Sequence, residues 1–378
     1  MNVMPRDLIC LMCPNGCHLT IDVQGDQRIE LQGNLCDKGV DFARTVLDSL
    51  NVKTPVRGDS AVYSEAELKR IASFWGISLK TVCPRLIPEG SPERTLFRVV
   101  IEDALGAYYV LEQIPASVYL AKMRIIQSLE YLSRNGLASI TPYRADSEGR
   151  YIRKVDRGLW QLVPYIHGVP LDRETYLYEG WRADVLSRFL IELREKSRGI
   201  PFFSLEDPFS IKNYIHALVR QIDRHAPEIM PRIIPVLAFL EKRFMGVCDS
   251  LPVGFCHGDY HPLNIVWGTE EILSVIDWEF LGIKPEIYDL VNMVGCLGIE
   301  HPSSLVGDLV RKLIARLRAA DLYSDVSWRH FLEFVVAMRF AWLSEWLRKD
   351  DREMIGLELD YMDLLIQNRD VLVREWTG

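Results

Sequence analysis

The stretch of sequence that decides the fold begins at residue 257 and reads His257-Gly258-Asp259-Tyr260-His261-Pro262-Leu263-Asn264. It contains a glycine and a proline, which favour a tight loop over a helix. Asp259 and Asn264 lie five positions apart in this stretch. We therefore expect the loop to present both side chains to one site.

A β-hairpin is expected directly after the loop. The segments 264–267 and 273–276 are apolar and partly β-branched, and a polar turn containing Gly268 separates them. This is the pattern of two paired strands. The second strand leads into Ile276-Asp277-Trp278-Glu279. One local unit therefore carries the loop and the carboxylate of Asp277.

Three polar residues of this unit, Asp259, Asn264 and Asp277, suit phosphoryl transfer. Moving a phosphoryl group from ATP to a hydroxyl requires a carboxylate that orients the attacking oxygen and oxygen ligands for Mg²⁺. The developing charge is stabilised mainly by positioning and by metal ions. Two carboxylates and one amide meet this requirement.

At these residues the chain resembles the aminoglycoside phosphotransferase and choline kinase superfamily, whose H-G-D-x-H-x-x-N loop and I-D-W-E strand end match without a gap. The resemblance implies that Asp259 is the catalytic base and that Asn264 and Asp277 hold Mg²⁺. It also implies structural roles for three further residues, which are His257, His261 and Asp289.

The same resemblance implies an α+β fold of the protein kinase-like type over residues 61–378. We expect an antiparallel-sheet small lobe at 61–162, a hinge at 163–168 and a mainly helical large lobe at 169–378. Three small-lobe strands are predicted at 86–91, 95–100 and 108–111. Helices are predicted at 65–74, 117–135, 184–195 and 331–347.

Two segments are expected to contact the nucleotide. Gly90 and Ser91 fall where the family places its phosphate-covering loop, although an ordinary hairpin turn fits this pair as well. Val163, Pro164 and Ile166 fall in the expected hinge. There a proline costs nothing, because only its carbonyl is needed, while the amide of Ile166 would donate to adenine.

One residue departs from the family pattern. The third small-lobe strand normally ends in Leu-Lys or Leu-Arg, whose cation contacts the α- and β-phosphates, but here Glu112 stands at that position. A carboxylate would repel the nucleotide. The helix that follows carries Ile125 or Gln127 where the acidic partner of that lysine is expected.

The missing cation leaves two interpretations open. Lys122, Arg124 or Arg98 could contact the phosphates, with Glu112 as the acidic partner in a reversed ion pair. The chain would then be an ATP-dependent kinase of a small hydroxylated molecule, such as a sugar, amino sugar or amino alcohol. Alternatively, it is a catalytically impaired pseudokinase that acts as a scaffold.

A cysteine-rich segment precedes the kinase-like region. Four of the eight cysteines fall in the first 36 residues, at Cys10, Cys13, Cys17 and Cys36. Such a cluster can bind tetrahedral zinc or a [4Fe-4S] cluster. The segment resembles the N-terminal cluster segment of molybdopterin oxidoreductases and a family of short bacterial proteins of unknown function. We predict a separate domain over residues 1–60, which could recruit a redox protein partner; free thiols and disulfides are the alternatives.

Composition limits the remaining function classes. The chain has 378 residues, is 48% hydrophobic and carries a net charge of −8. The negative charge disfavours a nucleic-acid-binding surface and suits a cationic or neutral acceptor. Neither a signal peptide nor an apolar run of about 18 residues is present, so we expect a cytoplasmic protein without membrane contacts.

Overall fold

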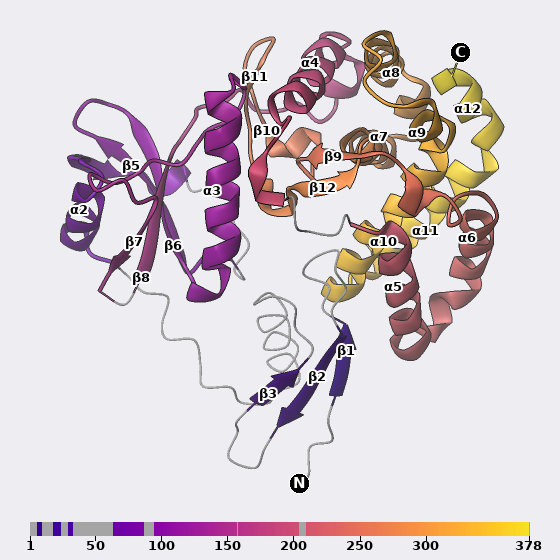
Figure 1. Ribbon diagram of the computed structural model, residues 1–378, viewed down its shortest axis with the longest axis horizontal. Coiled ribbons are helices and arrows are strands. Elements are labelled where there is room, and N and C mark those ends of the chain that lie inside the picture. The colour runs from indigo at the N-terminus through magenta and orange to yellow at the C-terminus, as the bar shows by residue number, and fades with distance from the viewer. Residues whose placement is uncertain are drawn as a thin grey trace.

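The computed structural model describes residues 6–9, 18–23, 29–32, 63–86, 94–156, 158–203 and 209–377. Several predicted features lie outside these residues: the boundary near residue 60, and the residues Cys10, Cys13, Cys17, Cys36, Gly90 and Ser91. In the N-terminal part, three described segments form an antiparallel sheet of their own in the order β1-β2-β3 (Figure 1). These strands are β1 (Arg6–Ile9), β2 (His18–Val23) and β3 (Ile29–Gln32).

An antiparallel sheet of five strands in the order β4-β5-β6-β8-β7 forms the small lobe. Side chains alternate across it, so Leu111 packs in the apolar core of the lobe while its neighbours Val110 and Glu112 line a cavity on the other face. The strands are β4 (Leu79–Val82), β5 (Phe97–Asp103), β6 (Tyr108–Ile114), β7 (Ile152–Val155) and β8 (Gly158–Pro164).

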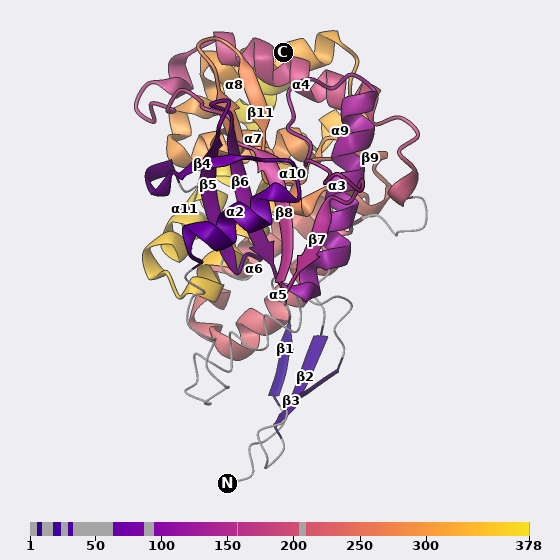
Figure 2. The ribbon, with the colours of Figure 1, turned by 90° about the vertical axis from the view of Figure 1, so that its left-hand side faces the viewer.

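Two helices pack against this sheet. Helix α2 (Glu65–Ser73) begins at a capping box formed by Ser64 and Glu67 and buries its apolar stripe on the outer face of the sheet. Helix α3 (Tyr119–Arg134) lies between the sheet and the large lobe (Figures 1 and 2). The two helices agree with the helices predicted at 65–74 and 117–135.

The first small-lobe strand differs from its prediction. The sheet begins with β4, which was not predicted, and Leu86 belongs to a 3-10 turn, Pro84–Leu86, rather than to a strand. The rest of the strand predicted at 86–91 lies outside the described residues. Proline has no amide hydrogen to donate to a sheet ladder, so the strand ends before Pro84.

The large lobe contains two short antiparallel strand pairs. The predicted hairpin is confirmed as β10 (Ile265–Trp267) paired with β11 (Ile272–Val275). A second pair joins β9 (Val253–Cys256) to β12 (Gly282–Pro285), and this pairing was not predicted. The loop at residues 257–264, called the catalytic-type loop below, therefore lies between β9 and β10, and each of these strands is paired with another strand.

The rest of the large lobe is helical. Helix α7 is buried along most of its length, and α10 packs on it with Phe334 and Phe340 fully buried. The helices are α4 (Trp181–Lys196), α5 (Ile211–His225), α6 (Met230–Arg243), α7 (Tyr288–Glu300), α8 (Asp308–Ala319), α9 (Asp325–Arg329), α10 (Phe331–Lys349), α11 (Arg352–Gln367) and α12 (Arg369–Thr377).

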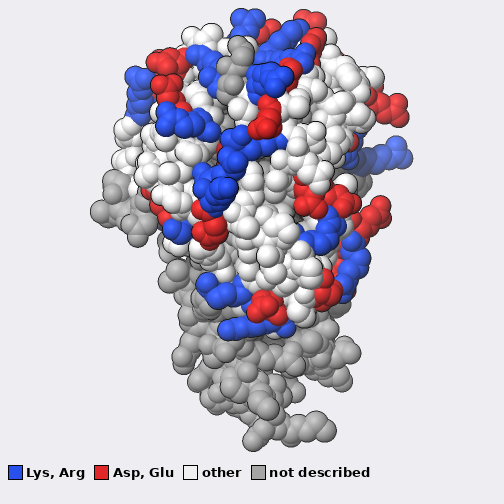
Figure 3. Space-filling view, turned by 90° about the vertical axis from the view of Figure 1, so that its right-hand side faces the viewer, with Lys and Arg blue, Asp and Glu red and all other residues white. Residues whose placement is uncertain are grey.

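Ion pairs connect the outer helices of this lobe. Arg232 of α6 contacts Asp360 and Asp363 of α11, each at 2.8 Å, and Arg311 of α8 contacts Glu375 of α12 at 2.6 Å. The face in Figure 3 accordingly shows basic and acidic side chains next to one another around an uncharged strip. Among the described helices, none is long and apolar enough to cross a membrane.

Candidate active site

The loop at residues 257–264 is held by a buried carboxylate of α7. The backbone N–H groups of His257 and Gly258 donate to the two oxygens of Asp289, each at 2.8 Å. Burial raises the pKa of Asp289 to about 6, although these two N–H donors oppose the shift. Gly258 has φ +87°, and a Cβ atom there would lie 2.0 Å from the carbonyl oxygen of Phe280. The structural role expected for Asp289 is confirmed.

His257 joins the loop to the end of β11. Its Nδ1 accepts the backbone N–H of Asp259 at 3.1 Å, so its Nε2 carries the proton and donates to the carbonyl of Ile276 at 2.9 Å. The ring is fully buried, and burial lowers its pKa to about 4. His257 is therefore neutral near pH 7 and braces the loop, as expected.

Asp259 lies at the centre of a small hydrogen-bond network. Its Oδ2 accepts from Nδ2 of Asn264 at 3.0 Å and lies 3.6 Å from Nε2 of His261, while its Oδ1 lies 3.4 Å from Nδ2 of Asn292. Burial alone would raise the pKa of Asp259, but His261, His257 and Asn264 outweigh it and lower the pKa. The group is thus an ionised carboxylate held by donors.

Asn264 and Asp277, the two expected metal ligands, carry side-chain oxygens that could hold a cation near Asp259. The Nδ2 of Asn264 donates to the backbone oxygen of Asp259 at 2.9 Å as well as to its carboxylate. The Oδ1 of Asn264 is therefore left for a cation. Burial raises the pKa of Asp277, and nearby Arg94 offsets this only in part. A carboxylate that lacks a full counter-charge, next to an amide oxygen, fits Mg²⁺.

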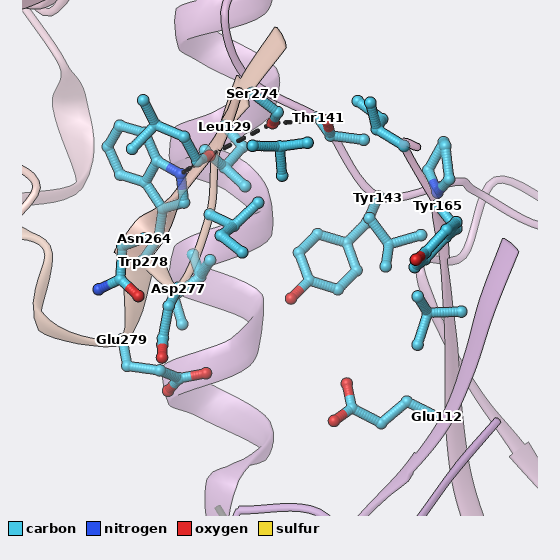
Figure 4. Close-up of a pocket in the computed structure, with 18 of the residues that line it drawn as sticks. Glu112, Leu129, Thr141, Tyr143, Tyr165, Asn264, Ser274, Asp277, Trp278 and Glu279 are labelled. Carbon is cyan, nitrogen blue, oxygen red and sulfur yellow. Dashed lines mark hydrogen bonds between the residues drawn. The ribbon is translucent and has the colours of Figure 1, made fainter. Parts of the chain in front are cut away.

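A cavity of about 630 Å³ opens between the two lobes next to these ligands. Its lining comes from the start of β5 and the residues just before it, from β6, the end of β8 and α3, and from the β10–β11 hairpin with the residues that follow it. Asp259 is not part of the lining and contacts it through Asn264. Figure 4 shows Asn264, Asp277 and Glu279 on one side of the pocket and Glu112, Tyr143 and Tyr165 on the other.

The expected hinge forms the inner end of this cavity. Val163 and Pro164 end β8, and Ile166 follows at the lining of the cavity. The amide of Tyr165 donates to the carbonyl of Tyr108 at 2.8 Å. Within the described residues, no hydrogen bond engages the amide of Ile166, which is the donor expected for adenine.

Glu112 has a cationic partner in the cavity. Its Oε1 accepts from Nη2 of Arg98 at 2.6 Å and from Nε of Arg98 at 3.1 Å, and also from the hydroxyl of Thr95. Its Oε2 accepts from Nε2 of Gln161 at 2.5 Å. Burial would raise the pKa of Glu112, but Lys122 and Arg98 more than offset this and lower it. The buried carboxylate of Glu112 is thus ionised, and the charge of Arg98 compensates its negative charge.

Lys122 of α3 belongs to a second ion pair. Its ammonium group contacts Oε1 of Glu279, and its side chain is 5% exposed. Burial opposes the charge, but Tyr143, Glu279 and Glu112 outweigh it and raise the pKa of Lys122. Arg124, the third candidate cation, instead lies over the ring of Phe203, with its Cζ 5.7 Å from the ring centroid.

The sequence pattern of the phosphotransferase enzyme family matches residues 86–324, which is more than half of the chain. The chain belongs to this family. Its match spans the loop, the hairpin, the hinge and Glu112, so the phosphotransferase region includes the whole cavity. A comparison with curated protein sequences found no match.

The phosphotransferase fold is similar to that of several solved enzymes. An aminoglycoside phosphotransferase from Alicyclobacillus acidocaldarius has a TM-score of 0.60 and 12% identity, over 86% of this chain and 98% of that chain. Spectinomycin phosphotransferase, solved with ADP and spectinomycin, has a TM-score of 0.58 and 14% identity over 84% and 94%. An enzyme solved with GDP and kanamycin has a TM-score of 0.56 and 19% identity over 81% and 99%. These similarities confirm the kinase-like α+β fold.

Three residues of the phosphotransferase site were missed from the sequence. Glu279 was quoted in the strand-end motif without a role, although it pairs with Lys122. Arg94 and Asn292 received no role, although both lie next to expected site carboxylates. Arg94 lies three residues after Ser91 of the expected phosphate-covering segment, which could have indicated it. Asn292 lies too far along the chain from Asp259 for any local pattern to connect the two.

Proposed function

We propose that this phosphotransferase moves the terminal phosphoryl group of ATP to a hydroxyl group of a small molecule. The observation that carries the proposal is that the loop at 257–264 and the hairpin after it place Asn264 and Asp277 at a cavity of about 630 Å³, with Asp259 hydrogen-bonded to Asn264. Structurally similar enzymes solved with ADP and spectinomycin, or with GDP and kanamycin, support a nucleotide donor and a small acceptor such as a sugar or amino sugar.

In this proposal, Asp259 accepts the proton of the attacking hydroxyl. The hydroxyl oxygen forms a bond to the γ-phosphorus, and the bond from that phosphorus to the bridging oxygen of ADP breaks. Asn264 and Asn292 hold the carboxylate of Asp259 from two sides, which fixes its direction toward the acceptor. Mg²⁺, held by Asn264 and Asp277, would neutralise the phosphate oxygens during transfer.

The adenine ring is assigned to the hinge. The amide N–H of Ile166 and the carbonyl of Pro164 supply one donor and one acceptor at the lining of the cavity. Val163 covers the same end of the cavity with an apolar side chain. Gly90 and Ser91 are proposed from the sequence alone to cover the phosphates.

An acceptor screen tests the proposed function. Purified protein is incubated with ATP and Mg²⁺ and a panel of aminoglycosides, simple sugars, amino sugars and amino alcohols, and ADP formation is measured. We expect at least one class of hydroxylated acceptor to stimulate ADP formation, and chelation of Mg²⁺ with EDTA to remove the stimulation. Nucleotide binding without stimulation by any acceptor would contradict the small-molecule assignment.

A pseudokinase scaffold is the second candidate, and Glu112 is the observation that favours it. Loss of the strand cation weakens nucleotide positioning in an enzyme that depends on it. Against this, the base and both metal ligands are present, and Glu112 is paired with Arg98 rather than left facing the nucleotide. The site therefore supports turnover better than it supports a scaffold.

The cysteine segment supports a separate proposal from sequence alone. We propose that Cys10, Cys13, Cys17 and Cys36 bind zinc or an iron-sulfur cluster, in a domain that could recruit a redox protein. Elemental analysis of anaerobically purified protein should find about one zinc or a cluster's iron, and Cys13→Ser should lose it. Protein that contains neither metal, with these thiols freely titratable, would contradict the proposal.

A further inference from the structure

The cavity contains three cationic side chains near the expected phosphates, and two of them are already engaged. Arg98 forms two hydrogen bonds to the buried Glu112. Lys122 contacts the carboxylate of Glu279 and is itself buried. Moving either cation to a phosphate would leave a buried carboxylate without its counter-charge, which is strongly unfavourable.

Arg94 is the third cation, and its contacts are different. Its Nη1 lies 3.6 Å from Oδ1 of Asp277 and 3.7 Å from Oε2 of Glu279, and both distances are too long for hydrogen bonds. This nitrogen is buried and has no hydrogen-bond acceptor among the described residues. The two carboxylates hold the guanidinium at the wall of the cavity without satisfying its Nη1 donors.

We propose that Arg94 binds the nucleotide phosphates in place of the cation that is missing at Glu112. Arg94 lines the cavity beside Asp277, the expected metal ligand, so it lies where the phosphates of a bound nucleotide would be. A guanidinium presents a rigid planar set of donors that matches phosphate oxygens and can bind them in a bidentate manner. The inference rests on the proposed nucleotide-dependent function.

The assignment is consistent with the way the other charged side chains of the cavity are paired. Arg98 neutralises Glu112 on the strand side, and Lys122 neutralises Glu279 on the helix side. Arg94 then remains as the positive group for the ligand, since its ion-pair contacts among the described residues are the long ones to Asp277 and Glu279. A cation bound by Asp277 would compensate that carboxylate and leave Arg94 to the phosphates.

Binding measurements with two ligands test the role of Arg94. Isothermal titration with ATP and with adenosine, both in the presence of Mg²⁺, separates phosphate contacts from base contacts. We expect Arg94→Gln to weaken ATP binding about 10- to 100-fold, the range for one lost charge-assisted hydrogen bond. Adenosine binding should stay unchanged, and Arg94→Lys should recover part of the loss for ATP.

A matched control removes one arginine from the same lobe outside the cavity. Arg70 of α2 is half-exposed and pairs with Asp156, so Arg70→Gln should leave both affinities unchanged. Arg94→Met, which keeps an aliphatic chain near the ring of Phe280, replaces Arg94→Gln if that variant does not fold. Thermal unfolding of each variant checks the fold.

The outcomes distinguish this inference from the proposed function. ATP affinity that is equal in wild type and the neutral Arg94 variants would overturn the role of Arg94 and leave the proposed function intact. An equal loss for ATP and adenosine would also overturn it, because the effect would then not come from the phosphates. Wild-type protein that binds neither ATP nor adenosine would contradict the proposed function and the inference together.

Discussion

At the scale of single residues, the carboxylate of Asp277 favours binding of a cation in the cavity. Its side chain is 42% exposed, and among the described residues its ion-pair partner is Arg94, at 3.6 Å. Burial against the lobe raises its pKa, which means that the ionised form lacks compensation. A bound cation would supply that compensation, and a proton would compete with the cation at low pH.

Replacing Asp277 should therefore remove the effect of Mg²⁺ on nucleotide binding. In Asp277→Ala, calorimetric titration with ATP should give the same affinity with and without Mg²⁺, whereas wild-type protein should bind more tightly with Mg²⁺. A variant that keeps the full Mg²⁺ dependence of wild-type protein would count against the metal site.

A substitution of Glu112 tests two alternatives for the small lobe. Either the Glu112–Arg98 ion pair belongs to a working nucleotide site, or the site has only lost its phosphate-binding lysine. The Arg98 and Gln161 side chains donate to this buried carboxylate. Glu112→Lys would place a third cation beside Arg98 and Lys122, so we expect a loss of stability of about 3 to 5 kcal/mol and no gain in ATP affinity. Denaturant unfolding and ATP titration measure the two effects. Tighter ATP binding by this variant would show that the site had simply lost its lysine.

At the scale of secondary-structure elements, α7 supports the catalytic-type loop through Asp289. The pKa of Asp289 is about 6 in the folded protein, above its ordinary value of 3.8. Between these values the folded state holds more protons than the unfolded state, so this group makes the protein less stable as the pH rises from about 4 to about 6.

Asp289→Asn should remove this dependence of stability on pH and one of the two hydrogen bonds from the backbone N–H groups of His257 and Gly258. We expect the variant to be less stable than wild type, with a difference that is larger near about pH 4.5 than near about pH 7.5, by up to about 3 kcal/mol. Denaturant unfolding at both pH values measures it. A difference that is constant with pH would show that Asp289 keeps an ordinary pKa in the fold.

Helices α7 and α10 also hold Asp259, the proposed base, through Asn292. The Nδ2 of Asn292 lies 3.4 Å from Oδ1 of Asp259, and its Oδ1 accepts from Nε1 of Trp342 at 3.2 Å. Asn292→Ala should lower kcat by roughly tenfold while leaving ATP affinity unchanged, because the base loses a positioning contact. Asn368→Ala, at the end of α11, serves as the control. Equal kcat values for wild type and Asn292→Ala would contradict the positioning role.

Elements defined by local patterns could be predicted from the sequence. The β10–β11 hairpin and the helices α2, α3, α4 and α10 lie where periodicity placed them, because each depends on neighbouring residues. The β9–β12 pairing could not be predicted, since its strands lie on either side of the loop and the other hairpin. The same limit applies to the site: Asp259, Asn264 and Asp277 come from one unit, whereas Asn292 reaches it through packing of α7 on the loop and Arg94 comes from the other lobe.

At the scale of the whole molecule, charge is arranged differently inside and outside the cavity. The chain carries a net charge of −8. The cavity, in contrast, brings together three cations, Arg94, Arg98 and Lys122, with the carboxylates of Glu112, Asp277 and Glu279. The lobes therefore enclose a site that is locally balanced and can accept an anionic ligand. The assigned boundaries, with lobes at 61–162 and 169–378 and a cysteine domain at 1–60, stay predictions.

The central claim is that the two lobes carry out phosphoryl transfer with Asp259 as the base. The measurement that tests it most directly is the rate of phosphorylation of the best acceptor by wild type and by Asp259→Asn, at saturating ATP and Mg²⁺. The substitution keeps the shape of the side chain and removes its basic oxygen. We predict that turnover falls by roughly 10²-fold or more while ATP affinity is unchanged. Turnover by Asp259→Asn at the wild-type rate would contradict the claim.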